Sequence, residues 1–424
     1  MNKVLKTISF VCILMLSAML TAQTTREEIY ETIEKSGGVY YAYPEVNETY
    51  APAPKGYEPF YISHYGRHGS RWLISDADYL RVMKVLDDAK AAGMLSEKGQ
   101  DVRRRLDVVW ADAEGMGGEL TPLGVRQHRG IAERMSKNFP EVFKGHRQVS
   151  ARSTVVIRCV LSMTSFCGRL KELNPSLDVT TESGERYMRY LNYWDEPARE
   201  FTGKGEWNKI YKQFREDHIR PARLMKSLFT DQQYVEQHID AKELMMGLYW
   251  IASDMQNVDI DMSFYDIFEK EELFDISQIH NFKFYVCNGT CPWGKDIVLN
   301  TFKPLLRNIL DSADAAIKNK SIAATLRFGH DGNITPLAGI LELENCANEE
   351  TDPAKFYQVW SDFKIAPMAA NIQIVFYRNK KNSDDVIVKF LHNEKEVTVP
   401  VQTNIAPYYR WSDVEKYYRK KLEN

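Results

Sequence analysis

The sequence predicts an α/β fold that is interrupted by a helical insertion. Strand-like apolar segments alternate with helix-like segments up to about residue 184, and the same alternation returns after residue 280. Between them, residues 185–280 are rich in Trp, Tyr, Met, Glu and Lys at helical spacing and contain few β-branched runs. This order is typical of one sheet-containing domain with an inserted helical unit. A chain of 424 residues, 44% of them hydrophobic, is long enough to build such a core.

The first 22 residues have the pattern of a secretory signal peptide. Lys3 and Lys6 precede an apolar stretch at 8–20, and the small residue Ala22 marks a cleavage site. An uncleaved anchor helix is the alternative, but the apolar stretch is shorter than the roughly 20 residues that a membrane span needs. We therefore expect residues 1–22 to be removed, leaving a periplasmic or secreted protein with no membrane span.

The first α/β part, residues 23–184, opens with Pro59-Phe60-Tyr61-Ile62, which predicts a short buried strand. A charged, helix-prone excursion follows at about 76–138. Within it, Thr121 and Pro122 have the pattern of an N-cap and a first helical position, so the excursion is predicted to end in a helix.

A second strand is predicted at 148–151, followed by the polar segment Arg152-Ser153-Thr154 and a helix with apolar residues along one side. After the insertion, Phe282-Lys283-Phe284-Tyr285-Val286 predicts the first strand of the second α/β part, residues 281–424. The later predicted elements are a helix over 296–319 broken near Pro304, a strand over 322–328, a helix over 334–343, a hairpin at 371–377 and 386–391, and a helix over 412–422.

The composition limits which molecules the protein can bind and how its cysteines can pair. A formal net charge of -3 gives no basic excess for binding nucleic acid. Five cysteines follow the signal segment, and because this number is odd at least one thiol is unpaired within the chain. Cys287 and Cys291 flank a turn-like segment and could close a small disulfide loop. No spacing resembles a zinc site, and we expect neither a metal nor a cofactor.

Three polar segments share one layout, in which each follows a predicted strand and precedes a predicted helix. They are Arg67-His68-Gly69-Ser70-Arg71, Arg152-Ser153-Thr154 and His330-Asp331. If the strands are parallel neighbours, the three segments converge at one edge of the sheet. A guanidinium matches phosphate oxygens two at a time, and a neutral imidazole between two guanidiniums can attack a bound phosphoryl group. The pattern predicts a phosphate site.

These segments resemble the histidine phosphatase superfamily, in particular its acid phosphatase branch, which includes phytases and multiple inositol polyphosphate phosphatases. The resemblance covers about residues 57–345 and implies a phosphoglycerate mutase-like three-layer α/β/α domain, with residues 185–280 as a mainly helical cap over the pocket. The matching blocks, in the family order, are Arg67-His68-Gly69-Ser70-Arg71, Leu120-Thr121-Pro122-Leu123-Gly124 with Gln127, Arg152-Ser153-Thr154 with Arg158 and Ser162, and Gly329-His330-Asp331-Gly332-Asn333 through Leu343.

The resemblance implies a role for each site residue. His68 is the nucleophile and becomes phosphorylated, and Asp331 donates a proton to the leaving alcohol and then helps to activate water. The residues that grip the phosphoryl oxygens are Arg67, Arg71, Arg152 and His330, whereas Arg158 is expected to be structural. Phosphoryl transfer depends mainly on charge stabilisation and alignment, which these side chains supply. Because Asp331 must be protonated to act as an acid, we expect an acidic or mildly acidic optimum.

The predicted function is that of a secreted, monomeric phosphomonoesterase that hydrolyses small phosphate esters, such as phytate and other inositol polyphosphates, through a phosphohistidine. One alternative is a broad-specificity acid or sugar phosphatase, because Gly332 stands where many phytases have Thr. An alternative from another class is a non-catalytic phosphate-ligand binding protein, which the presence of both His68 and Asp331 disfavours. A phosphoglycerate mutase-like transferase is disfavoured by the signal segment and the acid phosphatase-like blocks.

Overall fold

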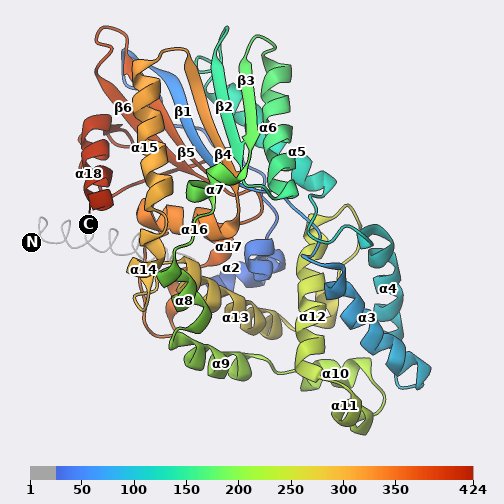
Figure 1. The fold of residues 1–424 in the computed structure, drawn as a ribbon. Coiled ribbons are helices and arrows are strands. Elements are labelled where there is room, and N and C mark those ends of the chain that lie inside the picture. The colour runs from blue at the N-terminus through green and yellow to red at the C-terminus, as the bar shows by residue number, and fades with distance from the viewer. Residues whose placement is uncertain (1–24, 424) are drawn as a thin grey trace, which may run out of the picture.

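The computed structural model describes residues 25–423, and its upper part in Figure 1 is a mixed sheet with helices on both faces. The strands lie in the order β3-β2-β4-β1-β5-β6-β7, and β8 pairs with β6. The predicted α/β class is confirmed. The strand bounds are β1 Tyr57–Arg67, β2 Gln148–Ser153, β3 Asp178–Ser183, β4 Ile322–Gly329, β5 Asn371–Asn379, β6 Val386–His392, β7 Lys395–Val397 and β8 Tyr409–Arg410.

The three strands that carry the predicted site segments are parallel neighbours in the centre of the sheet. β4 pairs with β1 on one side and with β2 on the other, and Arg67 of β1 aligns with Gly329 of β4. The carboxyl ends of these strands therefore share one edge, as predicted. β5 is antiparallel to both β1 and β6, which confirms the hairpin predicted near the C-terminus.

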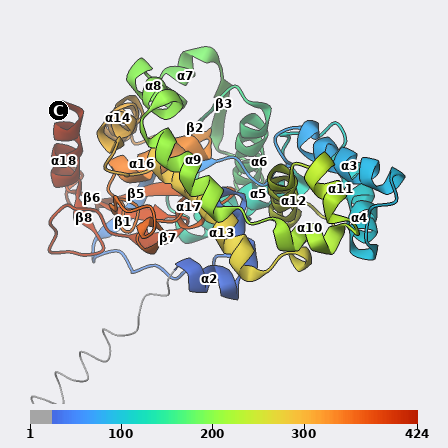
Figure 2. The same cartoon turned by 90° about the horizontal axis from the view of Figure 1, so that it is seen from below.

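Helices cover both faces of this sheet, giving three layers (Figure 2). α5 (Pro122–Asn138) and α6 (Ile157–Leu173) lie on one face, and α15 (Lys303–Lys318) with α7 (Glu185–Leu191) lies on the other. The Thr121 side chain accepts a hydrogen bond from Gly124 N–H at 3.2 Å, so α5 begins as predicted. The remaining helices of the second α/β part are α14 Lys295–Asn300, α16 Asp331–Ile340, η4 Phe356–Gln358, α17 Asp362–Ile365 and α18 Trp411–Glu423.

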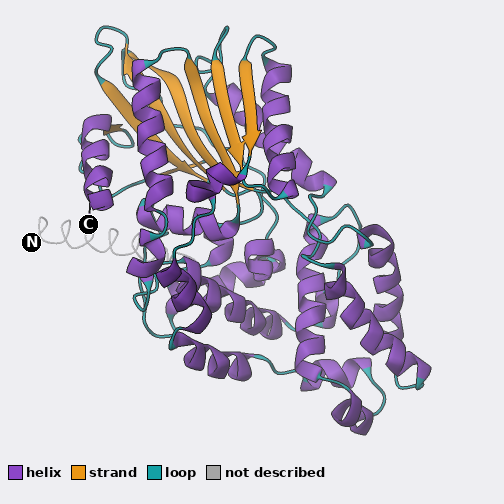
Figure 3. Ribbon diagram, viewed as in Figure 1, coloured by secondary structure: helices purple, strands orange, loops and turns teal. Residues whose placement is uncertain are grey.

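A largely helical region lies beyond the carboxyl edge of the central strands (Figure 3). It combines the helices before α5 with those of the insertion, and α12 packs against both α3 and η1. The division of the chain into an α/β domain and a cap stays a prediction. The helices are α2 Thr25–Glu31, η1 Ile33–Tyr40, α3 Asp76–Ala91, α4 Glu97–Ala113, α8 Glu196–Lys204, α9 Trp207–His218, α10 Ala222–Leu228, α11 Gln232–His238, α12 Ala241–Asp254, η2 Met255–Asn257, η3 Tyr265–Ile267 and α13 Lys270–Asn288.

The strand predicted at 282–286 is wrong, because these residues form the last turns of α13. The aromatic and β-branched residues of this short run are typical of a strand. Over the longer window, however, buried side chains continue at helical spacing, with Phe282, Tyr285 and Val286 on the side that faces the core. The boundary expected between residues 280 and 281 therefore falls inside one continuous helix.

Two further expectations concern the ends and the cysteines. The predicted signal peptide, residues 1–22, lies outside the described residues. Within residues 25–423, no helix combines the length and the apolarity that crossing a bilayer requires. The five cysteines of this stretch are buried free thiols, so no disulfide closes the loop between Cys287 and Cys291.

Candidate active site

His68 lies in the turn that follows β1 and is 2% exposed. Its Nδ1 lies 2.9 Å from the carbonyl oxygen of Gly69. A carbonyl oxygen only accepts, so Nδ1 carries the proton and Nε2 keeps its lone pair. Burial, followed by the charges of Arg67 and Arg158, holds the pKa of His68 well below its usual value. The imidazole is therefore neutral and chemically able to act as a nucleophile.

The backbone of this turn is held by side chains from α5 and α6. Gly69 N–H donates to Ser162 Oγ at 3.1 Å, and Ser70 N–H donates to Gln127 Oε1 at 2.8 Å. Gly69 also packs directly on α5, where a Cβ on Gly69 would lie 2.6 Å from the Cα atom of Gly124. These contacts give a physical reason for the presence of Gly124, Gln127 and Ser162 in the recognised blocks.

Arg67 is completely buried at the end of β1. Its Nη1 donates to the carbonyl oxygens of Val39 and Ala366, and its Nη2 forms an ion pair with Asp331 Oδ2 at 2.8 Å. Burial lowers the pKa of Arg67 to about 10 even though the charge of Asp331 acts in the opposite direction. The guanidinium is thus fixed in place and remains charged at neutral pH.

Arg71 lies at the far end of the turn that follows β1, three residues after His68. Its guanidinium carbon lies 4.6 Å from the centre of the Tyr40 ring, a cation–π distance, and its Nη1 donates to the carbonyl oxygen of Trp72 at 2.7 Å. Arg71 is 4% exposed. Its charge lowers the pKa of His68, which places Arg71 in the same electrostatic cluster.

His330 and Asp331 follow β4 and begin α16. The His330 ring centre lies 5.6 Å from that of His68, and its Nε2 lies 3.2 Å from Thr154 Oγ1. Burial, with the charge of Arg158, lowers the pKa of His330 to about 4. Burial alone would raise the pKa of Asp331, but Arg67, His330 and Arg71 outweigh it and lower that pKa to about 2. Asp331 is therefore ionised at neutral pH.

The structure does not bring Arg152 into this cluster, which corrects the expectation from the sequence. Arg152 belongs to strand β2 instead of the loop after it, and it aligns with Glu182 and Arg327 of the neighbouring strands. Its Nε donates to Glu182 at 3.1 Å, and its guanidinium stacks on Tyr187 at 4.9 Å. Side chains at one register position share a face of the sheet, and Arg327 contacts Asn308 of α15 on that face.

Arg158 takes the place that the sequence analysis gave to Arg152. It lies in the first turn of α6, and its Nη1 donates to the carbonyl oxygen of Gly118 at 3.2 Å. Its charge lowers the pKa values of both His68 and His330, which requires proximity to the two rings. The sequence contained a usable indication, because the first turn of a helix that follows a central strand lies at the carboxyl edge of the sheet.

Three guanidiniums therefore surround His68, and each has a buried Nε–H group with no hydrogen-bond partner in residues 25–423: Arg67, Arg71 and Arg158. Buried donors without partners are rare in folded proteins because each costs the free energy of desolvation. A bound anion would satisfy all three and would also neutralise their mutual repulsion. The arrangement is chemically suited to a tetrahedral oxyanion above a neutral imidazole.

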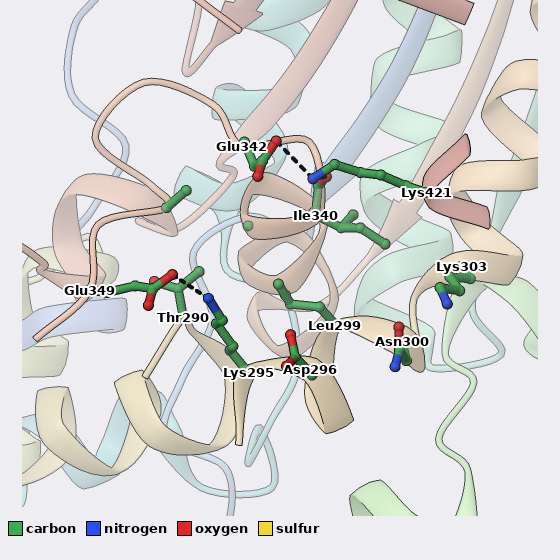
Figure 4. Close-up of a pocket in the computed structure, with 12 residues that line it drawn as sticks. Thr290, Lys295, Asp296, Leu299, Asn300, Lys303, Ile340, Glu342, Glu349 and Lys421 are labelled. Carbon is green, nitrogen blue, oxygen red and sulfur yellow. Dashed lines mark hydrogen bonds and ion pairs between the residues drawn. The ribbon is translucent and has the colours of Figure 1, made fainter. Parts of the chain in front are cut away.

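A surface pocket of about 520 Å³ lies near the opposite end of α16 from Asp331 (Figure 4). Ten residues of helix separate the two places by about 15 Å. Two ion pairs among its lining residues, at 2.5 and 2.7 Å, balance their charges: Lys295 with Glu349 and Lys421 with Glu342. This pocket is therefore distinct from the guanidinium cluster around His68.

A neutral imidazole among three guanidiniums, at the carboxyl edge of a mixed α/β sheet, is the arrangement expected of a protein that acts on phosphate esters. A family model described as "Histidine phosphatase superfamily (branch 2)" matches residues 112–393, about two-thirds of the chain. The chain belongs to this family, as predicted, and is a phosphoric monoester hydrolase. The matched range includes Arg158, His330 and Asp331 and begins after Arg71.

Known relatives agree with this assignment. The chain is 21% identical over 321 residues to "Multiple inositol polyphosphate phosphatase 1" of Gallus gallus, covering 72% of this chain and 70% of that protein. A Bifidobacterium longum multiple inositol polyphosphate phosphatase in complex with inositol hexasulfate superposes with a TM-score of 0.78 at 19% identity, covering 91% of this chain and 97% of that one. The phytase from D. castellii gives 0.68 at 16% identity, covering 92% and 85%. At these identities the structures establish the fold.

Proposed function

We propose that this protein hydrolyses inositol polyphosphates, with His68 as the nucleophile. The observation that carries the proposal is the neutral His68 imidazole, with Nδ1–H bound to Gly69, beside three guanidiniums whose Nε–H groups find no hydrogen-bond partner within residues 25–423. Relatives support the substrate class, because the Gallus gallus protein is named for inositol polyphosphates and the Bifidobacterium longum structure holds inositol hexasulfate.

In the first step, Nε2 of His68 attacks phosphorus while the bond from phosphorus to the leaving alcohol oxygen breaks. Arg67, Arg71 and Arg158 donate to the equatorial oxygens, where charge must be stabilised in the transition state. His330 lies close enough to His68 to donate to the same phosphoryl group. The products of this step are a phosphohistidine and the alcohol.

Asp331 supplies the proton that the leaving oxygen needs. Before substrate binds, the pKa of Asp331 is about 2 because Arg67 and its neighbours stabilise the carboxylate. An incoming phosphate places negative charge nearby and takes over guanidinium donors, and both effects raise the pKa of Asp331. In the second step the Asp331 carboxylate accepts a proton from water as the water attacks phosphorus, and phosphate leaves from His68.

Replacing Asp331 by Asn should slow the first turnover of a substrate with a poor leaving group and spare that of a substrate with a good one. An inositol alkoxide is a poor leaving group, so we expect the first turnover of phytate to slow by about 10²–10⁴-fold. For 4-nitrophenyl phosphate, whose phenolate leaves unaided, we expect a normal burst of 4-nitrophenol followed by slow turnover. Rapid-mixing assays measure both rates. An equal loss of the first turnover with the two substrates would rule out the acid role of Asp331.

A substrate panel tests the proposed substrate class. We expect kcat/KM for phytate to exceed that for glucose 1-phosphate and glucose 6-phosphate by at least about tenfold, with kcat falling as pH rises and Asp331 loses its proton in the complex. Phosphate release is measured across pH, and the inositol phosphate isomers are separated. Preference for the sugar phosphates would instead indicate a broad-specificity acid or sugar phosphatase.

We also propose that the protein is exported and acts as a monomer outside the cytoplasm. The pattern of Lys3, Lys6 and the apolar stretch at 8–20 supports cleavage of a signal peptide after Ala22. An enzyme so placed would meet phosphate esters from the surroundings of the cell.

A further inference from the structure

Asp254, the last residue of α12, is a carboxyl group buried beneath the segment that carries Arg71. It is 2% exposed. Its Oδ2 accepts a hydrogen bond from the Tyr79 hydroxyl at 3.0 Å, and that hydroxyl accepts one from Leu73 N–H at 3.0 Å. Asp254 is therefore connected through one phenol to the backbone two residues beyond Arg71.

A second set of contacts joins the same end of α12 to the site. Asn257 accepts a hydrogen bond from Ser70 Oγ at 2.7 Å and donates to the Tyr40 carbonyl oxygen at 2.8 Å and to Asp254 Oδ1 at 3.4 Å. The ring of Tyr40 packs on the Arg71 guanidinium. Asp254 thus belongs to a buried hydrogen-bond network that reaches the segment carrying Arg71 through Tyr79 and through Asn257.

Asp254 and Arg71 influence each other electrostatically across this network. Burial alone would lower the pKa of Arg71, but Tyr40 and Asp254 together raise it. For Asp254 the balance is the reverse. Burial raises its pKa to about 7, although the charge of Arg71 and the hydrogen bond from Tyr79 act to lower it. Two phenols with raised pKa values also act on the pair, Tyr79 of α3 and Tyr40 of η1, and Asp78 of α3 acts on Tyr40. On its other side Arg71 interacts with the charged and titratable groups of the site, which are Asp331, Arg67, Arg158, His68 and His330.

We propose that Asp254 is a titratable positioning residue that sets the anion affinity of the phosphate pocket through Arg71. When Asp254 is neutral, the whole charge of Arg71 is available to a bound oxyanion. When Asp254 is a carboxylate, its negative charge partly offsets the positive charge of Arg71 and repels the anion. The inference rests on the proposed function of the pocket and adds that acid strengthens substrate binding, separately from the protonation of Asp331.

The pH range of this effect distinguishes Asp254 from the other site residues. Before an anion binds, the pKa values are about 2 for Asp331, about 4 for His330 and about 10 for Arg67, and the pKa of His68 lies well below its usual value. The charges of these four groups therefore stay constant between about pH 5.5 and pH 8.5 until an anion binds. Asp254, with a pKa of about 7, changes its charge within this range. Because a bound anion also raises the pKa of Asp331, the part of the pH dependence that reports on Asp254 is the part that Asp254→Asn removes.

Sulfate is the probe for the experiment because its own charge does not change in this range. The dissociation constant of sulfate is measured by isothermal titration calorimetry on the full-length mature protein at several pH values. We expect sulfate to bind about tenfold more weakly at pH 8.5 than at pH 5.5 in the unaltered protein. In Asp254→Asn, which keeps an acceptor for Tyr79, we expect a change of less than about twofold.

Two further variants make the test specific. Tyr79→Phe removes a hydrogen bond that lowers the pKa of Asp254, so the midpoint of the sulfate curve should move to higher pH. This shift also tests the proposal if Asp254→Asn does not fold. The matched control is Asp112→Asn, which removes an exposed carboxylate that accepts from Trp72 Nε1 beside Arg71 and should leave the pH dependence unchanged.

The outcomes separate this inference from the proposed function. Affinity for sulfate that does not change with pH, or an Asp254→Asn variant with the full pH dependence, would overturn the role of Asp254. Neither result depends on turnover, because sulfate binding is measured directly. Failure of the proposed function would instead appear as absence of phosphate release from any ester, whatever the sulfate curve shows.

Discussion

Replacing His68 with Ala should reduce kcat for phosphate release by about 10⁴–10⁶-fold, because the nucleophile of the first step is lost. His68 presents a neutral ring whose Nδ1–H is held by Gly69, so its lone pair faces away from that contact. No water molecule bound in place of the imidazole would gain the same alignment with the leaving oxygen. Steady-state assays on phytate and 4-nitrophenyl phosphate measure the loss.

The matched control for this variant is His146→Ala, which removes an exposed imidazole that contacts the Ser176 carbonyl oxygen away from the site. Activity within about twofold of the unaltered protein is expected for the control. Both variants should unfold at closely similar temperatures. A His68→Ala protein that is folded and retains more than about 1% of the activity would exclude a nucleophilic role for His68.

The second large effect concerns the third phosphate-binding arginine, which the sequence predicted to be Arg152 and the structure indicates to be Arg158. Arg158→Ala should reduce kcat/KM by about 10²–10³-fold, because one donor to the developing phosphoryl charge is removed. Arg152→Ala should change kcat/KM by less than about threefold, because this side chain pairs with Glu182 and stacks on Tyr187. The same phosphate-release assay measures both variants, and each serves as the control for the other.

The opposite ranking would contradict the site described above. If Arg152→Ala were the severe variant and Arg158→Ala the mild one, substrate binding would have to rearrange β2 and the first turn of α6. Equal severity would indicate that Arg152 reaches the substrate from the α7 side. The pair therefore tests the placement of the third guanidinium independently of His68.

The sequence predicted the central architecture because that part of the fold depends on local patterns. The N-cap at Thr121 and the apolar runs of β1 and β4 are each visible within a few residues. β3 was not predicted, because this edge strand carries no fully buried side chain and has no apolar run. The run at 282–286 was misassigned because five residues are too few to distinguish a buried helix from a strand.

The residues of the site could be predicted where they directly follow a central strand, and not where tertiary packing places them. His68, Asp331 and their neighbours follow strands whose ends are set by clear apolar runs, so their convergence could be inferred. Arg152 was misplaced because β2 extends two residues farther than its apolar core suggests, which carries Arg152 onto a face of the sheet. Asp254 and Asn257 reach the site only through tertiary packing of α12, and no pattern near them in the sequence indicates that contact.

The most direct test of the central claim is to trap the phosphorylated enzyme. Mature protein is mixed with phytate, denatured within milliseconds at alkaline pH, digested, and analysed by mass spectrometry. We expect an acid-labile phosphate on the peptide that contains His68. It should be present in the unaltered protein, accumulate in Asp331→Asn during turnover of 4-nitrophenyl phosphate, and be missing in His68→Ala. Turnover without protein-bound phosphate, or phosphate on another residue, would contradict it.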